Sequence, residues 1–511
     1  MRTWKTGELI TADKLNEIGF DIEGAKYSEL INPRLDKYAN NFHLNNPIST
    51  AMNDIQSGFY RDGVWHLYYL YNADVSWGGN GTEWYHVTTN DWVKFENQGV
   101  AIHKYKTAYG DIATGTIWID DNDVIGKGKG TIFAMATGFG GDKGQNTMLY
   151  YSTDNGYNFT AYQEDAVMLH PKGQEDFRDP YIFKMGDTYV LYHAENNKFG
   201  VYTSKQLNTG YGYVGGYFAP HPLLECPNLF VMNVNGDKNN QKWVLFYGGN
   251  GGDDLQTGTY ASVGHLDDKF VFQPEFEGIR CDWGPDFYAS KPFADTNAPD
   301  VNDHLLCVGW LGSWGYVGAV PKETRGGVGA SSCRKLRLVQ NNGVYKITSE
   351  VMGVGDYLDN PVVGTANLLN QTEYNLPKFK GDSFKLEIKL KSTKNYKGNI
   401  QIKFYGYGYD TEFTYYFGHN NVSVHRHNEQ FTNNGVFSKD HTFPLDLSSS
   451  LDTFMTFYVD RVVIEALNQD GTIYTMTKFP LGRSREQISI KADGGDVPIE
   501  YYYYQITKQG E

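Results

Sequence analysis

The sequence predicts an all-β protein in which a β-propeller is followed by a β-sandwich. The 511 residues include 57 glycines and 15% aromatic residues, a composition typical of chains with many strands and turns. Between residues 46 and 350, short strand-like runs come in groups tens of residues apart, which favours propeller blades of about four strands. Between residues 351 and 511, runs such as 384–391 alternate strictly between apolar and polar residues, as half-buried antiparallel strands do.

The first 45 residues are expected to be separate from the propeller. A short helix is predicted over residues 8–19, because Thr11 can cap its start, Asp13 favours its first turn and Gly19 can end it. A helix of this length is marginal in water and needs a partner surface. Residues 20–45 read as a polar connector. We therefore expect residues 1–45 to serve attachment or oligomerisation.

Local signals support the strands of both predicted domains. The turns Arg61-Asp62-Gly63 and Met185-Gly186-Asp187 lie between strand-like runs and indicate hairpins. Strict alternation also occurs at residues 399–405 and 487–491, which predicts further sandwich strands. Residues 360–376, between the two modules, are predicted to be a linker.

Charge and cysteine content exclude several classes of function. Lys and Arg total 45 and Asp and Glu total 60, so the net charge is −15, which argues against binding nucleic acid or an anionic membrane. No apolar run approaches the roughly 18 residues of a membrane span. The four cysteines show neither a disulfide framework nor zinc-ligand spacing. We expect them to be buried free thiols.

Three carboxylates lie in unusual sequence surroundings. Asp54 precedes the first strong hairpin, Asp179 lies between Arg178 and Pro180, and Glu225 has apolar neighbours along the chain. An apolar setting suits a general acid because it disfavours the charged form. Each acid taken singly is more often a turn former or a solvated group, so the set as a whole carries the argument.

The set resembles glycoside hydrolase family 32, which contains fructan hydrolases and fructosyltransferases. The motifs are Met52-Asn53-Asp54, Arg178-Asp179-Pro180 and Glu225-Cys226, in the order that is typical of the family. Residues 84–88, 114–116, 282–290, 309–314 and 457–471 are similar to further family segments. The resemblance covers about residues 46–511 and implies a five-bladed β-propeller over 46–350 followed by a β-sandwich over 351–511.

The resemblance also implies roles for individual residues. Asp54 would be the nucleophile, Glu225 the general acid/base, and Asp179 the residue that stabilises the transition state of a retaining mechanism. No metal or cofactor is required for this chemistry. The residues implied in substrate binding are Asn53, Trp84, Thr114, Arg178, Asp282 and Trp310.

Departures from the family pattern bear on the substrate. Ala51, Ile55, Ala113 and Pro285 replace a tryptophan, a proline, an aromatic residue and a lysine that many members carry. Residues 70–84 resemble the branch with levanases and levan fructotransferases, so β-2,6-fructan (levan) is the expected substrate. Two alternatives stay open: a levan fructotransferase that makes cyclic difructose, and a non-catalytic fructan-binding protein. The sequence does not decide between endo and exo cleavage.

Residues 4–16 resemble the start of tail and appendage proteins of phages that infect Gram-positive bacteria. The first residues also lack the apolar stretch of a secretory signal peptide. We therefore expect a virion tail location, or an extracellular one reached without a signal peptide, with the cytoplasm as the alternative. Residues 1–40 would then join copies of this chain into a homo-oligomer or attach it to a virion tail as a depolymerase.

Overall fold

The computed structural model describes residues 38–74, 81–140, 144–251, 257–321, 328–379, 381–431, 434–447, 451–482 and 487–507. These ranges contain strands and four short 3-10 helices, namely η2 (Val317–Ala319), η3 (Val354–Tyr357), η4 (Thr393–Asn395) and η5 (Glu429–Phe431), which confirms the all-β prediction. In this part of the chain no helix is long and apolar enough to cross a membrane. The helix predicted over residues 8–19 lies outside the described residues.

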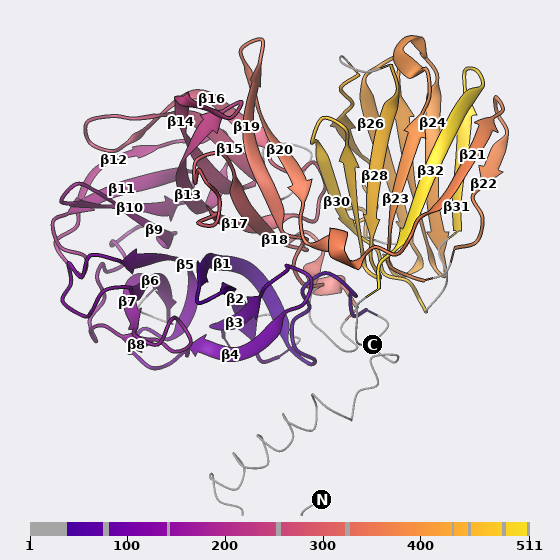
Figure 1. Ribbon diagram of the computed structural model, residues 1–511. Coiled ribbons are helices and arrows are strands. Elements are labelled where there is room, and N and C mark those ends of the chain that lie inside the picture. Colours follow the sequence, from indigo (N-terminus) through magenta and orange to yellow (C-terminus); the bar gives the residue numbers. More distant parts are fainter. Residues whose placement is uncertain are drawn as a thin grey trace, which may run out of the picture.

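The larger body is built from antiparallel sheets of sequential strands and lies beside the smaller one in Figure 1. Three sheets have four strands each: β1 (Ala51–Arg61), β2 (Val64–Asn72), β3 (Glu83–Thr89) and β4 (Glu96–Ile102); β5 (Asp111–Asp120), β6 (Thr131–Phe139), β7 (Gln145–Ser152) and β8 (Thr160–Ala161); β9 (Arg178–Met185), β10 (Thr188–Glu195), β11 (Lys198–Ser204) and β12 (Gly212–Tyr217).

An eight-stranded sheet completes this body. It contains β13 (Leu223–Val234), β14 (Asp237–Asn250), β15 (Thr257–Leu266), β16 (Phe272–Arg280), β17 (Tyr288–Ala294), β18 (Leu305–Trp310), β19 (Arg334–Asn341) and β20 (Val344–Val351). One parallel bridge, Val234 to Leu338, joins β13–β16 to β17–β20. Divided at this bridge, the strands of the described residues in the larger body form five sets of four. Their first strands contact one another in the cyclic order β1, β5, β9, β13, β17.

The predicted hairpin turns are confirmed. Arg61 pairs with Val64 across a two-residue turn, in which Asp62 and Gly63 both have positive φ angles of 52° and 87°. Positive φ at both central residues gives the type of turn whose twist matches that of the strands. Met185 likewise pairs with Thr188.

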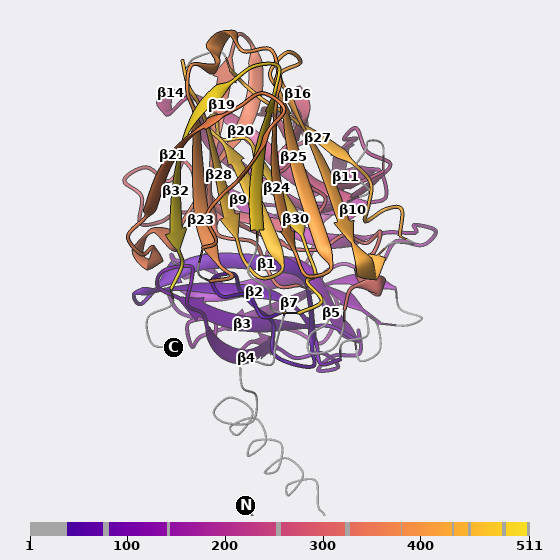
Figure 2. The same cartoon turned by 90° about the vertical axis from the view of Figure 1, so that its right-hand side faces the viewer.

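The smaller body is a sandwich of two six-stranded sheets, and its strands run from top to bottom in front of the propeller in Figure 2. One sheet contains β21 (Val362–Leu368), β32 (Val497–Gln505), β23 (Phe384–Leu390), β28 (Thr453–Val459), β29 (Val463–Asn468) and β30 (Ile473–Thr477). The other contains β22 (Glu373–Asn375), β31 (Gln487–Asp493), β24 (Asn399–Gly406), β25 (Tyr409–Tyr416), β26 (Asn421–Asn428) and β27 (His441–Pro444).

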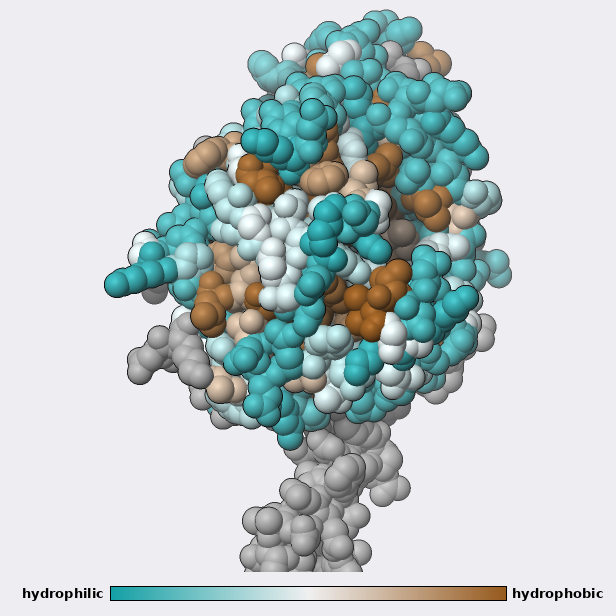
Figure 3. Space-filling view, turned by 90° about the vertical axis from the view of Figure 1, so that its left-hand side faces the viewer, coloured by the Kyte–Doolittle hydropathy of each residue, from teal (hydrophilic) through white to brown (hydrophobic). Residues whose placement is uncertain are grey.

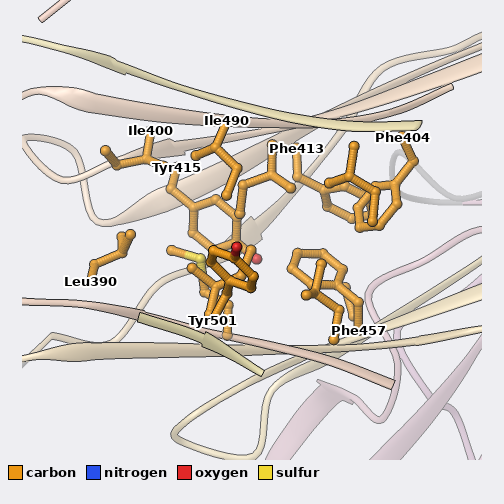
Figure 4. Packing of buried hydrophobic residues seen from close by; sticks show 14 of the residues in the cluster. Leu390, Ile400, Phe404, Phe413, Tyr415, Phe457, Ile490 and Tyr501 are labelled. Atoms are coloured by element: carbon orange, nitrogen blue, oxygen red, sulfur yellow. The ribbon is translucent and has the colours of Figure 1, made fainter. Parts of the chain in front are cut away.

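Alternation along the strands forms the core between the two sheets. In β23 every second residue, from Phe384 to Leu390, is buried, and these side chains meet those of Ile400, Phe413 and Ile490 from the other sheet (Figure 4). Burial at about 25 cal/mol per Å² of apolar surface is the main stabilising contribution of such a core. On the surface of the propeller that faces away from the sandwich, hydrophobic residues form separate patches among hydrophilic ones instead of a continuous core (Figure 3).

The linker predicted at residues 360–376 is wrong. β21 pairs with β32 and β22 pairs with β31, so this segment supplies an edge strand to each sheet of the sandwich. The prediction failed because most side chains of these two strands are exposed or half-buried. An edge strand without a strongly apolar face lacks the alternation that identifies a strand in the sequence.

Buried ion pairs join the propeller to the sandwich. Arg334 of β19 donates to Asp282 of the propeller at 2.6 Å and to Glu465 of β29 at 2.7 Å. A second pair joins Arg426 of β26 to Asp286 at 2.6 Å. Removing one partner of such a pair leaves an uncompensated buried charge, which destabilises a protein by about 3–5 kcal/mol.

Residues 41–43, expected in the separate connector of residues 20–45, belong to this interface, so the connector ends earlier than predicted. The backbone N–H groups of Asn41 and Phe42 donate to the Asp460 carboxylate of the sandwich at 2.8 and 2.9 Å. The His43 ring contacts Asp460 at 3.0 Å and Glu465 at 3.4 Å. Burial alone would lower the pKa of His43, but its contacts with the two carboxylates raise it to about 9. His43 is therefore a buried cation between two acids.

His43→Gln should destabilise the protein, and the loss should depend on pH. Because the folded pKa is raised to about 9, the stabilisation from this charge is fully present below the unfolded value of about 6.5. It is lost as the pH rises through 9. The free energy of unfolding, measured in urea, should be higher for the wild type than for the variant at acidic pH. This difference should shrink by about 3 kcal/mol between acidic and alkaline pH. An advantage that stays constant with pH would contradict the assignment of this charge.

Candidate active site

Each of the five first strands is irregular near its start. The pairing register shifts between residues 52 and 55 in β1, 112 and 115 in β5, 225 and 228 in β13, and 288 and 291 in β17, and a further shift lies beside Arg178 in β9. Such bulges redirect side chains that a regular strand would alternate. Asp179 and Cys226 also have positive φ angles of 58° and 52°, which are strained by about 1–3 kcal/mol each. The three candidate acids lie at these irregularities.

Asp54 lies in the bulge of β1 and is held by two neighbours. Its Oδ2 accepts a hydrogen bond from the Thr114 hydroxyl of β5 at 2.5 Å, and its Oδ1 accepts one from the Asn53 amide at 3.1 Å. Burial raises the pKa of Asp54 to about 7, and the charges of Asp179 and Glu225 add to this rise. Asp54 therefore binds a proton far more readily than an ordinary aspartate.

Asp179 faces Asp54 across the thiol of Cys226. The Cys226 Sγ lies 3.7 Å from Asp54 Oδ2 and 3.7 Å from Asp179 Oδ2, and the Cys226 backbone N–H donates to Asp179 at 3.0 Å. Burial raises the pKa of Asp179 to about 6, because the opposing effect of Arg178 is incomplete and the Glu225 charge adds to the rise. A half-buried carboxylate, Asp54, and a buried one, Asp179, thus share one side chain as their common contact.

Glu225 lies in a polar setting, so the apolar setting predicted for it is wrong. Arg178 Nη2 donates to its Oε1 at 3.0 Å, the Asn250 amide donates to its Oε2 at 2.9 Å, and the Tyr288 hydroxyl also donates to Oε2. Its apolar chain neighbour Leu224 is completely buried, whereas the Glu225 side chain is 18% exposed. Neighbours along a strand point to opposite faces, so adjacency in the sequence did not reveal these contacts.

Two further residues at the cluster were not predicted. Gln56 donates to the Asp54 carbonyl at 2.9 Å and accepts from the Gly115 N–H at 2.9 Å, which ties β1 to β5. Lys291 of β17 is buried and donates to the Gly115 carbonyl at 2.8 Å. A lysine within a buried strand was the signal available in the sequence, because lysine is almost never fully buried unless it is paired.

The six residues expected to bind substrate fall into three groups. Asn53, Thr114 and Arg178 contact the candidate acids directly. Trp84 and Trp310 are completely buried; the Trp84 indole donates to the Ala113 carbonyl at 2.9 Å, so it supports the strand that carries Thr114. The expectation for Asp282 is corrected, because it lies in the ion-pair network with Arg334 at the sandwich interface.

The four cysteines were expected to be buried free thiols. All four are buried and free, as predicted. Cys226 alone among them contacts the candidate acids in the described residues. Burial raises the pKa of its thiol well above the usual value, and the charges of Asp179 and Asp54 add to this rise. The thiol therefore stays neutral and acts as a spacer between two carboxylates.

The cluster has the groups that glycosidic bond cleavage requires. Glycosidases use a pair of carboxyl groups, one that protonates the leaving oxygen and one that attacks or activates a nucleophile. Here Asp54, Asp179 and Glu225 come from three different strands and interact electrostatically with one another. Near neutral pH such a set retains a proton, because charging all three groups together is unfavourable.

Comparisons with known proteins agree with this chemistry. Residues 43–348 match the profile of the "Glycosyl hydrolases family 32 N-terminal domain", and residues 358–505 match the family 32 C-terminal profile. A "Levanbiose-producing levanase" of Bacillus subtilis is 30% identical over 89% of this chain and 88% of its own length. A protein of the same name from Geobacillus stearothermophilus is 32% identical over 68% of this chain and 89% of its own length.

The fold comparison leads to the same family. The crystal structure of an exo-inulinase from Aspergillus awamori matches with a TM-score of 0.80 and 22% identity, and covers 92% of this chain and 98% of that one. A fructofuranosidase from Schwanniomyces occidentalis matches with a TM-score of 0.78 over 92% of this chain and 99% of that one. With both domain profiles matched in order, this chain is an enzyme that belongs to glycosyl hydrolase family 32.

Proposed function

We propose that this fructan hydrolase cleaves β-2,6-linked fructan by a retaining mechanism. The proposal rests on the clustering of Asp54, Asp179 and Glu225, which have different hydrogen-bond partners. Asp54 and Asp179 both contact one thiol, whereas Glu225 is held by an arginine, an amide and a phenol. Different settings give like groups different tasks.

In the proposed first step an Asp54 carboxylate oxygen attacks the anomeric carbon of a fructosyl unit. The bond from that carbon to the leaving oxygen breaks, and protonated Glu225 gives its proton to the leaving oxygen. In the second step Glu225 takes a proton from water, the water oxygen bonds to the anomeric carbon, and Asp54 is released. Asp179 would stabilise the positive charge that develops on the ring and bind its hydroxyl groups.

The proposed preference for levan is supported mainly by the similarity of this chain to two levanases. The two relatives named above as levanases each align over nearly nine-tenths of their own length. Of the positions that depart from the family pattern, Ala51 and Pro285 are buried and Ala113 is half-buried. The small side chains of Ala51 and Ala113 would leave a more open pocket than the aromatic residues that many family members carry there.

The substrate proposal predicts that kcat/KM on levan exceeds that on sucrose by at least about tenfold, since contacts with further fructosyl units stabilise the transition state. Initial rates on levan, inulin and sucrose, with chromatography of the products, provide the test. Hydrolysis yields reducing sugars from levan, whereas fructosyl transfer yields cyclic difructose without a reducing end. Equal kcat/KM on sucrose, or binding of levan without any product, would refute the proposal.

A second prediction concerns the ionisation of Asp54. The Thr114 hydroxyl favours the charged form, so Thr114→Val should raise the pKa of Asp54 above its value of about 7. The acidic limb of the kcat/KM profile should move to higher pH by about half a unit to one unit.

Thr116→Val is the matched control, because it removes an equally buried hydroxyl from the same strand. Its acidic limb should stay at the wild-type position. If the Thr114 variant lost activity equally at every pH, the hydroxyl would have no part in the ionisation of Asp54.

A further inference from the structure

Lys291 is a buried cation to which the proposed mechanism assigns no role. Its side chain is 3% exposed, and its Nζ donates to the Gly115 carbonyl at 2.8 Å. In the ring of first strands β1 lies between β17, which carries Lys291, and β5, which carries Gly115. A single carbonyl is a weak partner for a full charge, and a buried ammonium is strongly unfavourable unless it is compensated. The compensation must come from charges nearby.

Lys291 lies at the active-site cluster. The Gly115 carbonyl that its Nζ contacts follows Thr114, whose hydroxyl donates to Asp54 at 2.5 Å. Asp179 of β9 and Asp54 of β1 are the carboxylates whose charges act on its ammonium. The other titratable or charged groups at the site are Cys226, Tyr181, whose ring centre lies 5.9 Å from Nζ, Arg178, Glu225 and Tyr288.

Two cations, Arg178 and Lys291, act on the carboxylates of the site. Arg178 forms ion pairs with Asp176 and Glu225, and its charge also lowers the pKa of Asp179. Lys291 interacts with Asp54 and Asp179, which are the two carboxylates that share the thiol contact. Without a positive charge near them, two neighbouring carboxylates raise each other's pKa, and one of them keeps its proton to higher pH.

We propose that Lys291 is a positioning residue for the reaction, and that its ammonium keeps Asp54 and Asp179 ionised together so that Asp54 is available as the nucleophile. The proposal rests on the roles proposed above for these two carboxylates. The lysine touches neither the substrate nor the bond that breaks. Its effect is transmitted through the charge of the groups that do.

The sign of the expected effect follows from the charge. Burial lowers the pKa of Lys291 to about 8, against the raising effect of its acidic neighbours, so the ammonium is charged in the range where Asp54 and Asp179 titrate. A cation favours the ionised form of a carboxylate. Removing it should therefore raise the pKa of Asp54 and Asp179 and shift the acidic limb of activity to higher pH.

Two variants separate the charge from the hydrogen bond. Lys291→Met removes both, whereas Lys291→Gln removes the charge but keeps an N–H group that can donate to Gly115. On the fructan that the wild type cleaves fastest, we expect the acidic limb of kcat/KM to move up by about one pH unit in both variants. Activity should fall about tenfold at low pH and recover toward the wild-type level as the pH rises.

Lys478→Met is the matched control, because Lys478 is also a buried lysine, on the sandwich side of the molecule. This variant should lose stability without shifting the acidic limb. An unshifted limb in Lys291→Gln, with activity reduced equally at all pH values or unchanged, would overturn the proposal. If Lys291→Met does not fold, Lys291→Gln alone decides the question. A wild type that cleaves no fructan would instead refute the proposed function.

Discussion

Three carboxylates of like charge occupy one small volume in this protein, and much of the surrounding structure limits their mutual repulsion. Arg178 pairs with Glu225, Thr114 and Asn53 donate to Asp54, and the Cys226 N–H donates to Asp179. Burial and the repulsion that remains raise the pKa values of Asp54 and Asp179 to about 7 and 6. The pH at which Asp54 becomes an ionised nucleophile is therefore close to neutral.

The backbone that brings these groups together is irregular and is held by regular surroundings. Bulges and the positive φ angles of Asp179 and Cys226 occur at the ends of strands whose remaining residues pair regularly. The sandwich adds a second constraint, since Arg334 joins Asp282, a few residues before β17, to Glu465. β17 carries both Tyr288 and Lys291. The strained site is therefore supported by sheet pairing on one side and by buried ion pairs on the other.

Sequence patterns predicted the all-β fold and the three acids, because alternation, turn residues and motif order are local properties. They did not predict the partners of Glu225, since a bulged strand separates chain neighbours and joins distant residues such as Asn250 and Tyr288. Asp282 was misplaced for a related reason: a conspicuous acid gives no sign of whether its partner is a sugar or Arg334. The edge strands β21 and β22 were missed because their side chains are largely exposed.

The covalent bond proposed between Asp54 and the fructosyl unit can be tested directly by mass spectrometry of Glu225→Gln. The variant is allowed to react with a fructoside whose leaving group needs no proton, so that the first step proceeds and the second is slow. After an acid quench and proteolysis, the peptide containing Asp54 should carry the added mass of one fructosyl unit, and this mass should be absent when Asp54→Asn is combined with the first change. A label on the peptide containing Asp179, or product released with inverted anomeric configuration and no label, would contradict the account.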